Sequence, residues 1–231
     1  MRVVAKEAYI QRATKAGKWL TLVALGLLGG SLLIYMVRME WWFITLILGS
    51  LGFVCSVAGS YYGDRFAGPS AYHVSVPDAL KGFDDDYALL IYQKPVPFLL
   101  VEPGGLTVLL VKNQGGVVTY ANGKWRHKQG GKFFRQMGGQ EALGRPDEYA
   151  RLLAADLQRY LRKRLPEGMD VPVRPVIVFI APKVQLDAED SPVPALRAEK
   201  LKGWLRGPGR RPALPAETRR ALAEALGLSA A

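Results

Sequence analysis

The sequence predicts a mixed α/β sandwich preceded by two membrane-spanning helices. Residues 19–62 contain only two charged residues, Arg38 and Glu40, whereas the remainder of the 231-residue chain holds all the other charges. Beyond residue 86, short leucine-rich and β-branched runs alternate with helical stripes, which is typical of an α/β domain. The roughly 170 residues after the apolar part are enough for one domain with its own core.

Two apolar runs make up the predicted membrane part. Residues 19–37 and 41–62 are each close to the roughly 20 residues that a helix needs to cross a bilayer. A cleaved signal peptide would have a shorter apolar region and no second span directly behind it, so we expect a retained helical hairpin. The GxxxG pattern of Gly26 and Gly30 lies level with glycines of the second run, and close helix packing is expected there.

Positive charge predicts the orientation of this hairpin. The basic leader, residues 1–18, carries five Lys or Arg and one acid, whereas the short connection carries one of each. The leader is therefore expected in the cytoplasm, and two spans return the chain to the same side. Both termini are predicted to be cytoplasmic, with the leader able to lie on anionic lipid.

The soluble part is divided by its turn residues and apolar periods. Residues 63–77 are expected to be a linker, residues 78–206 an α/β domain, and residues 207–231 a flexible linker with a C-terminal helix. Predicted strands occupy 87–93, 98–101, 106–111, 117–120 and 175–180, with a hairpin at 122–123. Helices are expected within 78–86 and over 147–165, 195–205 and 216–226. The buried stripe of the second helix is predicted to be Leu152, Leu153, Leu157, Tyr160 and Leu161.

Several chemistries are excluded. Cys55 is the only cysteine and the chain has two histidines, so an intramolecular disulfide cannot form and a Cys/His zinc site lacks ligands. The sequence contains no GxSxG, GxxxxGK[ST] or HExxH motif.

A basic cluster suggests an anionic partner. Lys124, Arg126, Lys128, Lys132 and Arg135 fall within twelve residues that hold no acid, interleaved with Trp125, Phe133 and Phe134. Cations with aromatic rings suit phosphates and stacked, unpaired bases, which predicts binding of single-stranded nucleic acid. In the alternative interpretation, Trp125 and one Phe belong to the core, and the cations lie on a solvated hairpin or face anionic lipid.

One region resembles a known family. The runs 101–117 (VEPGGLTVLLVKNQGGV) and 122–125 (NGKW) resemble the centre of the nuclease-related (NERD) domain, and the resemblance covers about residues 78–206. That family is similar to the restriction-endonuclease-like PD-(D/E)xK fold. The resemblance therefore implies a PD-(D/E)xK-type α/β sandwich.

The resemblance also implies what a catalytic site would need. In the family an Asp and a Glu bind Mg²⁺, and a Lys two residues after the Glu helps to position or activate water. Lys112 stands at the lysine position, but Leu110 and Pro97 replace the Glu and the Asp. The chain thus resembles an inactive nuclease without a cofactor. Lys112 joins the predicted nucleic-acid-binding residues, although it is equally consistent with a strand-end lysine whose amine lies in water.

Three functions follow as alternatives. The first is a membrane-anchored nucleic-acid-binding or scaffold module without catalytic activity. The second is an active Mg²⁺-dependent nuclease in which acids from the set Glu102, Glu141, Glu148 and Asp84 to Asp86 converge near Lys112. The third is an assembly factor that binds other membrane proteins. The lipid bilayer is a partner in all three.

Overall fold

The computed structural model describes residues 1–68, 70–131 and 141–228. The chain forms two compact units. The α/β unit comprises Met1–Lys6, His73–Lys128 and Leu143–Ala231, and the hairpin unit comprises Glu7–Tyr72 and Gln129–Ala142.

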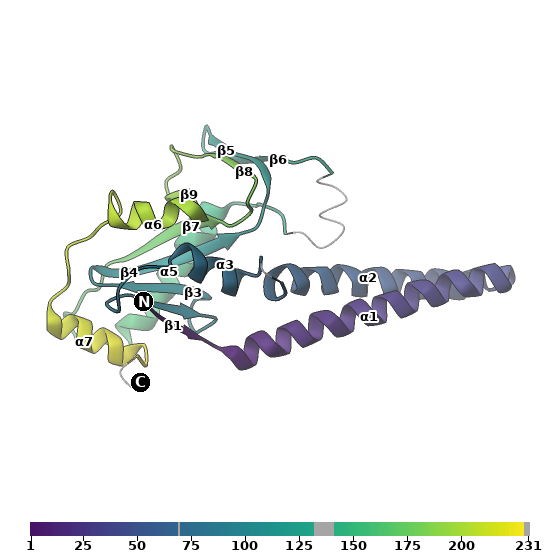
Figure 1. The fold of residues 1–231 in the computed structure, drawn as a ribbon, viewed down its shortest axis with the longest axis horizontal. Helices are drawn as coiled ribbons and strands as arrows, with labels where there is room; N and C mark the ends of the chain where they lie inside the picture. Colours follow the sequence, from purple (N-terminus) through teal and green to yellow (C-terminus); the bar gives the residue numbers. More distant parts are fainter. Residues whose placement is uncertain (69, 132–140, 229–231) are drawn as a thin grey trace. The chain divides into compact units, whose positions relative to one another are not determined.

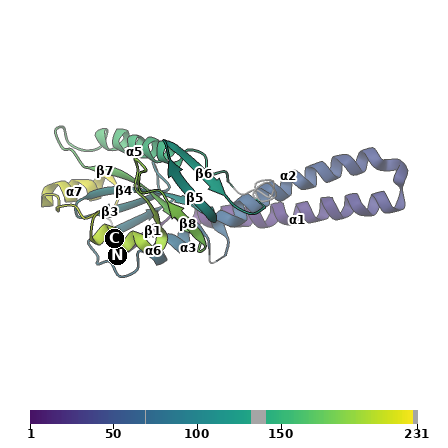
Figure 2. The same ribbon diagram turned by 90° about the horizontal axis from the view of Figure 1, so that it is seen from above.

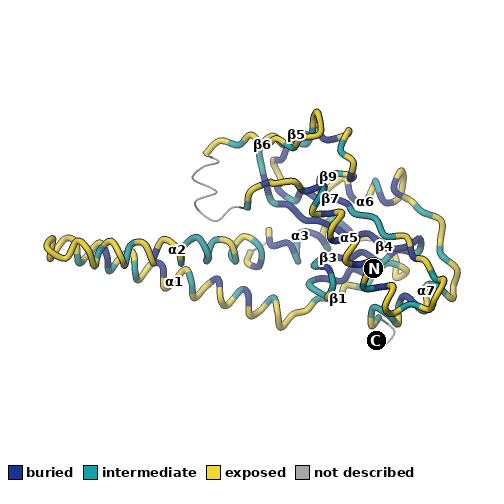
Figure 3. Tube along the Cα trace, turned by 180° about the vertical axis from the view of Figure 1, so that it is seen from behind, coloured by how far each residue is buried: buried dark blue, intermediate teal, exposed yellow. Residues whose placement is uncertain are grey.

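The hairpin unit is built on two long helices. These are α1 (Glu7–Val37) and α2 (Trp42–Phe66), joined through the short 3₁₀ helix η1 (Met39–Trp41). Both are long and apolar enough to cross a membrane. Most of their large apolar residues are exposed. Figure 3 shows exposed residues in yellow along the length of both helices. The two candidate spans predicted from the sequence are thus present, each inside a longer helix.

The helices pack along a seam of small residues that differs from the expected one. The buried positions are Ala13, Gly17, Ala24 and Ser31 on α1 and Gly52, Gly59 and Phe66 on α2. Their spacings of four and seven residues keep one face of each helix toward its neighbour. The prediction for Gly26 and Gly30 was wrong, because a Cβ added at either would meet no atom within 4 Å. The depth of a residue along the hairpin, which the sequence gives, does not determine which face of its helix turns toward the other helix.

The rest of the described chain is a mixed α/β fold (Figure 1). Its elements are β1 (Arg2–Ala5), α3 (Tyr72–Ala79), β2 (Ala88–Ile91), β3 (Phe98–Glu102), β4 (Gly105–Lys112), β5 (Gly116–Ala121), β6 (Lys124–Lys128), α5 (Pro146–Arg162), β7 (Val173–Phe179), β8 (Val184–Asp187), β9 (Ala195–Arg197), α6 (Ala198–Arg206) and α7 (Ala216–Ala225). One sheet has six strands in the order β1-β2-β3-β4-β7-β9, and the other has three in the order β6-β5-β8. The α/β class agrees with the prediction. The larger sheet is mixed, because β3 pairs in antiparallel fashion with β2 and β4 while the other strand pairs are parallel.

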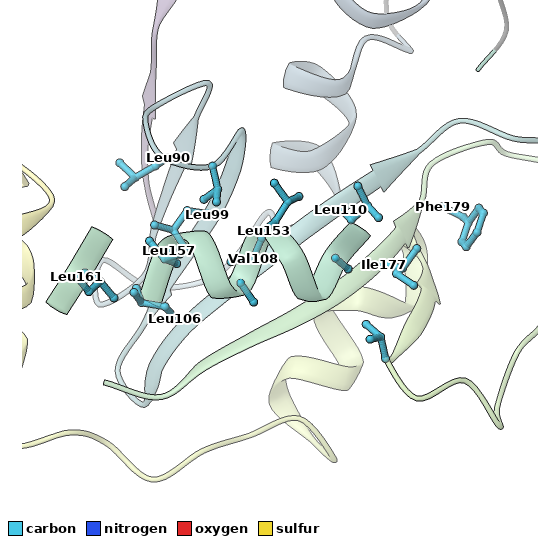
Figure 4. Packing of buried hydrophobic residues seen from close by; sticks show 14 of the residues in the cluster. Leu90, Leu99, Leu106, Val108, Leu110, Leu153, Leu157, Leu161, Ile177 and Phe179 are labelled. Carbon is cyan, nitrogen blue, oxygen red and sulfur yellow. The ribbon is translucent and has the colours of Figure 1, made fainter. Parts of the chain in front are cut away.

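The main core lies between the larger sheet and α5. Leu106, Val108 and Leu110 alternate along β4 and cluster with Leu153 and Leu157 of α5 (Figure 4). Figure 2 shows α5 and α6 on opposite sides of this sheet. One member of the predicted helical stripe is misplaced, because Leu152 is 60% exposed.

Three segments differ from their predicted character. The predicted linker 63–77 contains most of α3, whereas only the last two residues of α3 lie within 78–86, where a helix was expected. The helix begins earlier because Tyr72, Val76 and Leu80 make a buried stripe at helical spacing. The segment 207–215 is fixed, since the backbone N–H of Leu214 donates to the carbonyl of Pro103. Leu222 of α7 joins the main core, so the α/β unit extends past residue 206.

The start of the chain also belongs to the α/β unit. Residues Arg2–Ala5 form β1, which pairs in parallel with β2 along the register Arg2↔Ala88 to Ala5↔Ile91. The predicted basic leader is thus corrected at Arg2–Ala5, which form a strand of the larger sheet. The segment of chain between β1 and β2 includes both helices of the hairpin unit.

Candidate functional site

The β5–β6 hairpin carries the predicted basic cluster. Val117 to Ala121 pair in antiparallel fashion with Lys128 to Lys124. Between the strands, Asn122 and Gly123 have φ values of 52° and 72°. Two successive left-handed residues form the turn that matches the twist of a hairpin, so the hairpin predicted at Asn-Gly is confirmed.

The exposed face of β6 bears three cations, Lys124, Arg126 and Lys128, here called the cation row. They alternate with partly buried Trp125 and His127, as side chains of a strand must. Neighbouring cations are therefore about 6.8 Å apart along the strand. Within the described ranges no ion pair involves any of the three. Their charge is available to an external anion.

The surface beside the cation row is nearly free of negative charge. Val117, Thr119 and Ala121 of β5 lie across from the three cations in the register. Among the residues of β5, β6 and β8, Asp187 is the only acid, and it pairs with Thr119 from the far side of β5. Two interstrand spacings, about 9.6 Å, thus separate its backbone from that of Arg126. The sheet presents its cations on one edge.

Trp125 lies on the opposite face of β6, against the core. Its indole N–H donates a hydrogen bond of 2.8 Å to a carboxylate oxygen of Asp147. Its ring centroid is 5.1 Å from that of Tyr120 and 6.5 Å from that of Phe179. These contacts turn the indole away from the cation row, so the predicted stacking role of Trp125 is corrected to a structural one.

Two further members of the cluster, Lys132 and Arg135, lie outside the described residues, as do Phe133 and Phe134. The cation row is therefore defined on β6 alone.

Lys112 ends β4 and is buried. Only 4% of it is exposed, and it lies across from Phe179 in the pairing of β4 with β7. The alternative that places its amine in water is thereby excluded. The same burial removes Lys112 from the surface that an external nucleic acid would contact, so it is not part of the cation row.

The candidate metal-binding acids do not gather at Lys112. Glu102 lies across from Gly105 at the far end of β4, seven residues or about 23 Å from Lys112 along the strand. Asp84 and Asp86 line a cavity beside Glu102. Glu148 pairs with Arg145 at 2.6 Å, and Glu141 belongs to the hairpin unit, where it pairs with Arg65 at 2.5 Å.

Sequence reasoning missed Asp147, the carboxylate that accepts from Trp125. It is 9% exposed and lies in the first turn of α5, directly after Pro146. The helix dipole favours an acid in the first turn of a helix, so the sequence position of Asp147 is explained even if its hydrogen bond to Trp125 is not known. The link to Trp125 joins residues 22 positions apart and requires the packed fold.

Comparison of the chain with family models, curated proteins and solved structures found no match in any of the three. The function is therefore inferred from the residues and their geometry.

Proposed function

We propose that the chain is a two-span membrane protein whose α/β unit is a NERD-like domain without a nuclease metal site, and that it binds the nucleic-acid backbone at the cytoplasmic face of a membrane. The observation that carries the proposal is the cation row. Lys124, Arg126 and Lys128 point to one side of an edge strand and have no ion pair in the described part of the chain.

The strand register supports the NERD-like fold. In that family the Asp and the Glu share one metal ion, so the corresponding positions must be neighbours. The antiparallel ladder ends at Leu99↔Val108, and Pro97 precedes Leu99 by two residues as Leu110 follows Val108 by two. Both positions therefore lie beyond the same end of this ladder. Lys112 follows on the same face of β4, as the resemblance requires.

The same positions argue against catalysis. Leu110 has no ligand atom for a cation and Pro97 offers only its carbonyl, whereas Mg²⁺ prefers carboxylate oxygens. The candidate replacement acids lie at the other end of β4 or are paired elsewhere. A nuclease of this type needs the metal to hold the scissile phosphate and to acidify the attacking water.

The chemistry of the cation row favours phosphate contacts over base contacts. Three cations along a strand neutralise phosphates and release their counterions, which gives salt-dependent affinity. Base stacking would require an aromatic ring on the same face, and Trp125, the aromatic residue of β6, has its ring on the other one. Contacts from β6 itself are therefore expected to be independent of sequence and to favour no unpaired base.

The hairpin supplies the membrane anchor in this proposal. Two candidate spans with exposed apolar side chains suit a lipid environment. The excess of basic residues in the leader favours its retention in the cytoplasm, and the pairing of β1 with β2 requires the α/β unit on that same side.

The test is a fluorescence anisotropy titration of the full chain, in neutral detergent, with labelled DNA at several salt concentrations. Lys124→Ala, Arg126→Ala and Lys128→Ala in one variant should flatten the slope of log K against log salt by about 2 for single strands. The matched control removes three exposed cations of α5 and its C-terminal end, Arg151, Arg162 and Lys163, which have no ion pair within the described residues, and thus changes the net charge equally. An equal loss of DNA affinity in both variants would show that binding depends on the net charge of the chain and not on the cation row.

Vesicles distinguish the lipid alternative. If the same triple variant loses binding to anionic vesicles but not to DNA, the cation row serves the membrane surface. Binding to neither by the parent chain would favour a protein partner and the assembly function.

A further inference from the structure

A second site lies at the other end of the α/β unit and is independent of the cation row. A cavity of about 550 Å³ opens between the turn that precedes β2, the β3–β4 turn and the segment 207–215. We name it the charged cavity. Its volume falls within the range of small-molecule sites, about 300–1,000 Å³.

The floor of the charged cavity is a buried ion network. Glu102, whose side chain is 4% exposed, lies 3.1 Å from Arg174 and 3.2 Å from Arg211. The hydroxyl of Thr107 also donates to Glu102. Two guanidinium groups face one carboxylate, so this network retains one positive charge. The Nε atom of Arg211 is buried without a hydrogen-bond partner.

The walls carry unpaired charges of both signs. Asp84 and Asp86 line one side, and Arg210 lines the side formed by the segment 207–215. All three are exposed, and none has a side-chain ion pair in the parts of the chain that the structure describes. Opposite charges that share a cavity without meeting leave room for a molecule between them.

Tyr87 also lines the charged cavity. Burial raises the pKa of Tyr87 above its ordinary value, and the charges of Glu102 and Asp84 raise it further. Arg210 and Arg206 act on the same pKa in the opposite direction. Both signs of charge therefore reach a single group on the cavity wall.

From this arrangement we propose that the charged cavity binds a small zwitterion, with its ammonium group at Asp84 and Asp86 and its oxyanion at Arg210 and Arg211. The two wall acids balance Arg210 and the excess positive charge of the floor, so the complementary ligand has no net charge. A free amino acid and a phosphoethanolamine head group both have this chemistry.

A bound zwitterion would tie the segment 207–215 to the turn before β2. That segment is already held at Gly209, whose carbonyl accepts from Arg174 at 2.5 Å, and at Leu214, whose N–H donates to Pro103 at 2.8 Å. The exposed Arg210 lies between these two anchors. Ligand binding should therefore slow trypsin cleavage after Arg210, whereas cleavage after Arg211 is blocked in any case by Pro212.

The test is calorimetric titration of the full chain in detergent with each common amino acid and with glycerophosphoethanolamine, followed by limited trypsin digestion with the best probe. We expect binding of at least one of these zwitterions, and the probe that binds distinguishes the two sources. Arg210→Ala and the double change Asp84→Asn, Asp86→Asn should each weaken it by at least about tenfold. The controls Arg219→Ala and Asp170→Asn change exposed, unpaired charges elsewhere and should bind as the parent does.

Three results would overturn the proposal. The first is no binding of any of these zwitterions up to about 10 mM, a limit near 3 kcal/mol. The second is equal affinity in the Arg210→Ala variant. The third is equally tight binding of acetate, phosphate or ethylamine, because a ligand with a single charge would then suffice.

Discussion

The indole N–H of Trp125 is 2.8 Å from a carboxylate oxygen of Asp147, which links strand β6 to the first turn of α5. Both partners are sheltered, since Asp147 is 9% exposed and Trp125 packs against the main core. This contact fixes which face of β6 turns outward, and so it sets the direction of the cation row.

Removal of this hydrogen bond should destabilise the α/β unit. Asp147→Ala leaves a buried indole N–H without its acceptor, at a cost of about 1–3 kcal/mol. Trp125→Phe and the double variant complete a cycle, in which we expect a coupling of about 1 kcal/mol. Denaturant unfolding followed by circular dichroism measures it. Asp156→Ala, which breaks only an exposed pair with Arg159, should cost less than about 0.5 kcal/mol.

Restored carboxylates should bind metal if the resemblance assigns the positions on β3 and β4 correctly. Pro97→Asp with Leu110→Glu places two acids beyond the same end of the β3–β4 ladder, near Lys112, and calorimetry should detect Mn²⁺ binding that the parent lacks. Val111→Glu is the matched control, because Val111 points to the other face of β4. Both variants should lose stability, since Leu110 and Val111 are each only 6% exposed.

A nuclease assay on the parent chain decides the catalytic question separately. We expect no cleavage of DNA or RNA with Mg²⁺ or Mn²⁺. Metal-dependent cleavage that survives purification and disappears in Lys112→Ala would instead establish the active nuclease.

The helix seam predicts unequal effects of glycine substitution. A Cβ at Gly59 would lie 2.7 Å from the Oγ1 atom of Thr21, so Gly59→Val should force the helices apart and cost about 1–3 kcal/mol. Gly30→Val, at a position with no atom within 4 Å, serves as the control. Thermal unfolding in detergent compares the two. A larger loss at Gly30 would contradict the seam and favour contact with another chain.

Both termini should be cytoplasmic. Cysteines introduced at Met39 and at the C-terminus, in a background with Cys55→Ser, can be labelled in intact cells with an impermeant reagent. We expect labelling at position 39 alone, because the leader carries the excess of basic residues. External labelling of the C-terminus would reverse the orientation.

Acid should weaken the fold through His73. Burial lowers the pKa of His73 below its ordinary 6.5, because desolvation disfavours the charged ring. A group whose pKa is lower in the folded than in the unfolded state stabilises the fold at pH values above its unfolded pKa. This contribution is lost as the pH falls from about 6.5, the unfolded pKa, toward the lower pKa of the folded state. The unfolding midpoint should therefore drop between about pH 7 and 5, and His73→Gln should reduce that drop. With only two histidines, their NMR titrations can be assigned directly, and an unshifted His73 would contradict the prediction.

Local signals predicted much of the fold. The Asn122-Gly123 turn, the apolar run of β4 and the amphipathic α5 each contain their own structural cause within a few residues, and each formed as expected. The alternation that exposes Lys124, Arg126 and Lys128 follows from the same strand period.

Long-range contacts were beyond the sequence pattern. The proline- and glycine-rich segment 207–215 reads as a flexible linker, yet Arg211 and Gly104 pack so closely that a Cβ at Gly104 would lie 2.6 Å from that arginine. Strand β1 has four residues and pairs with residues more than eighty positions later. Nor does the period of α5 reveal that Leu152 lies just outside the buried stripe.

The parallel pair of β1 and β2 constrains the order of assembly during synthesis. Residues 2–5 are synthesised before the hairpin, but their partner, residues 88–91, emerges only after both of its helices. This edge of the larger sheet must therefore remain open until the spans have been made, and its closure costs the entropy of a long loop. Once paired, β1 and β2 hold the two outer ends of the hairpin on one side, so in a membrane a completed sheet is incompatible with a hairpin whose two ends lie on opposite sides.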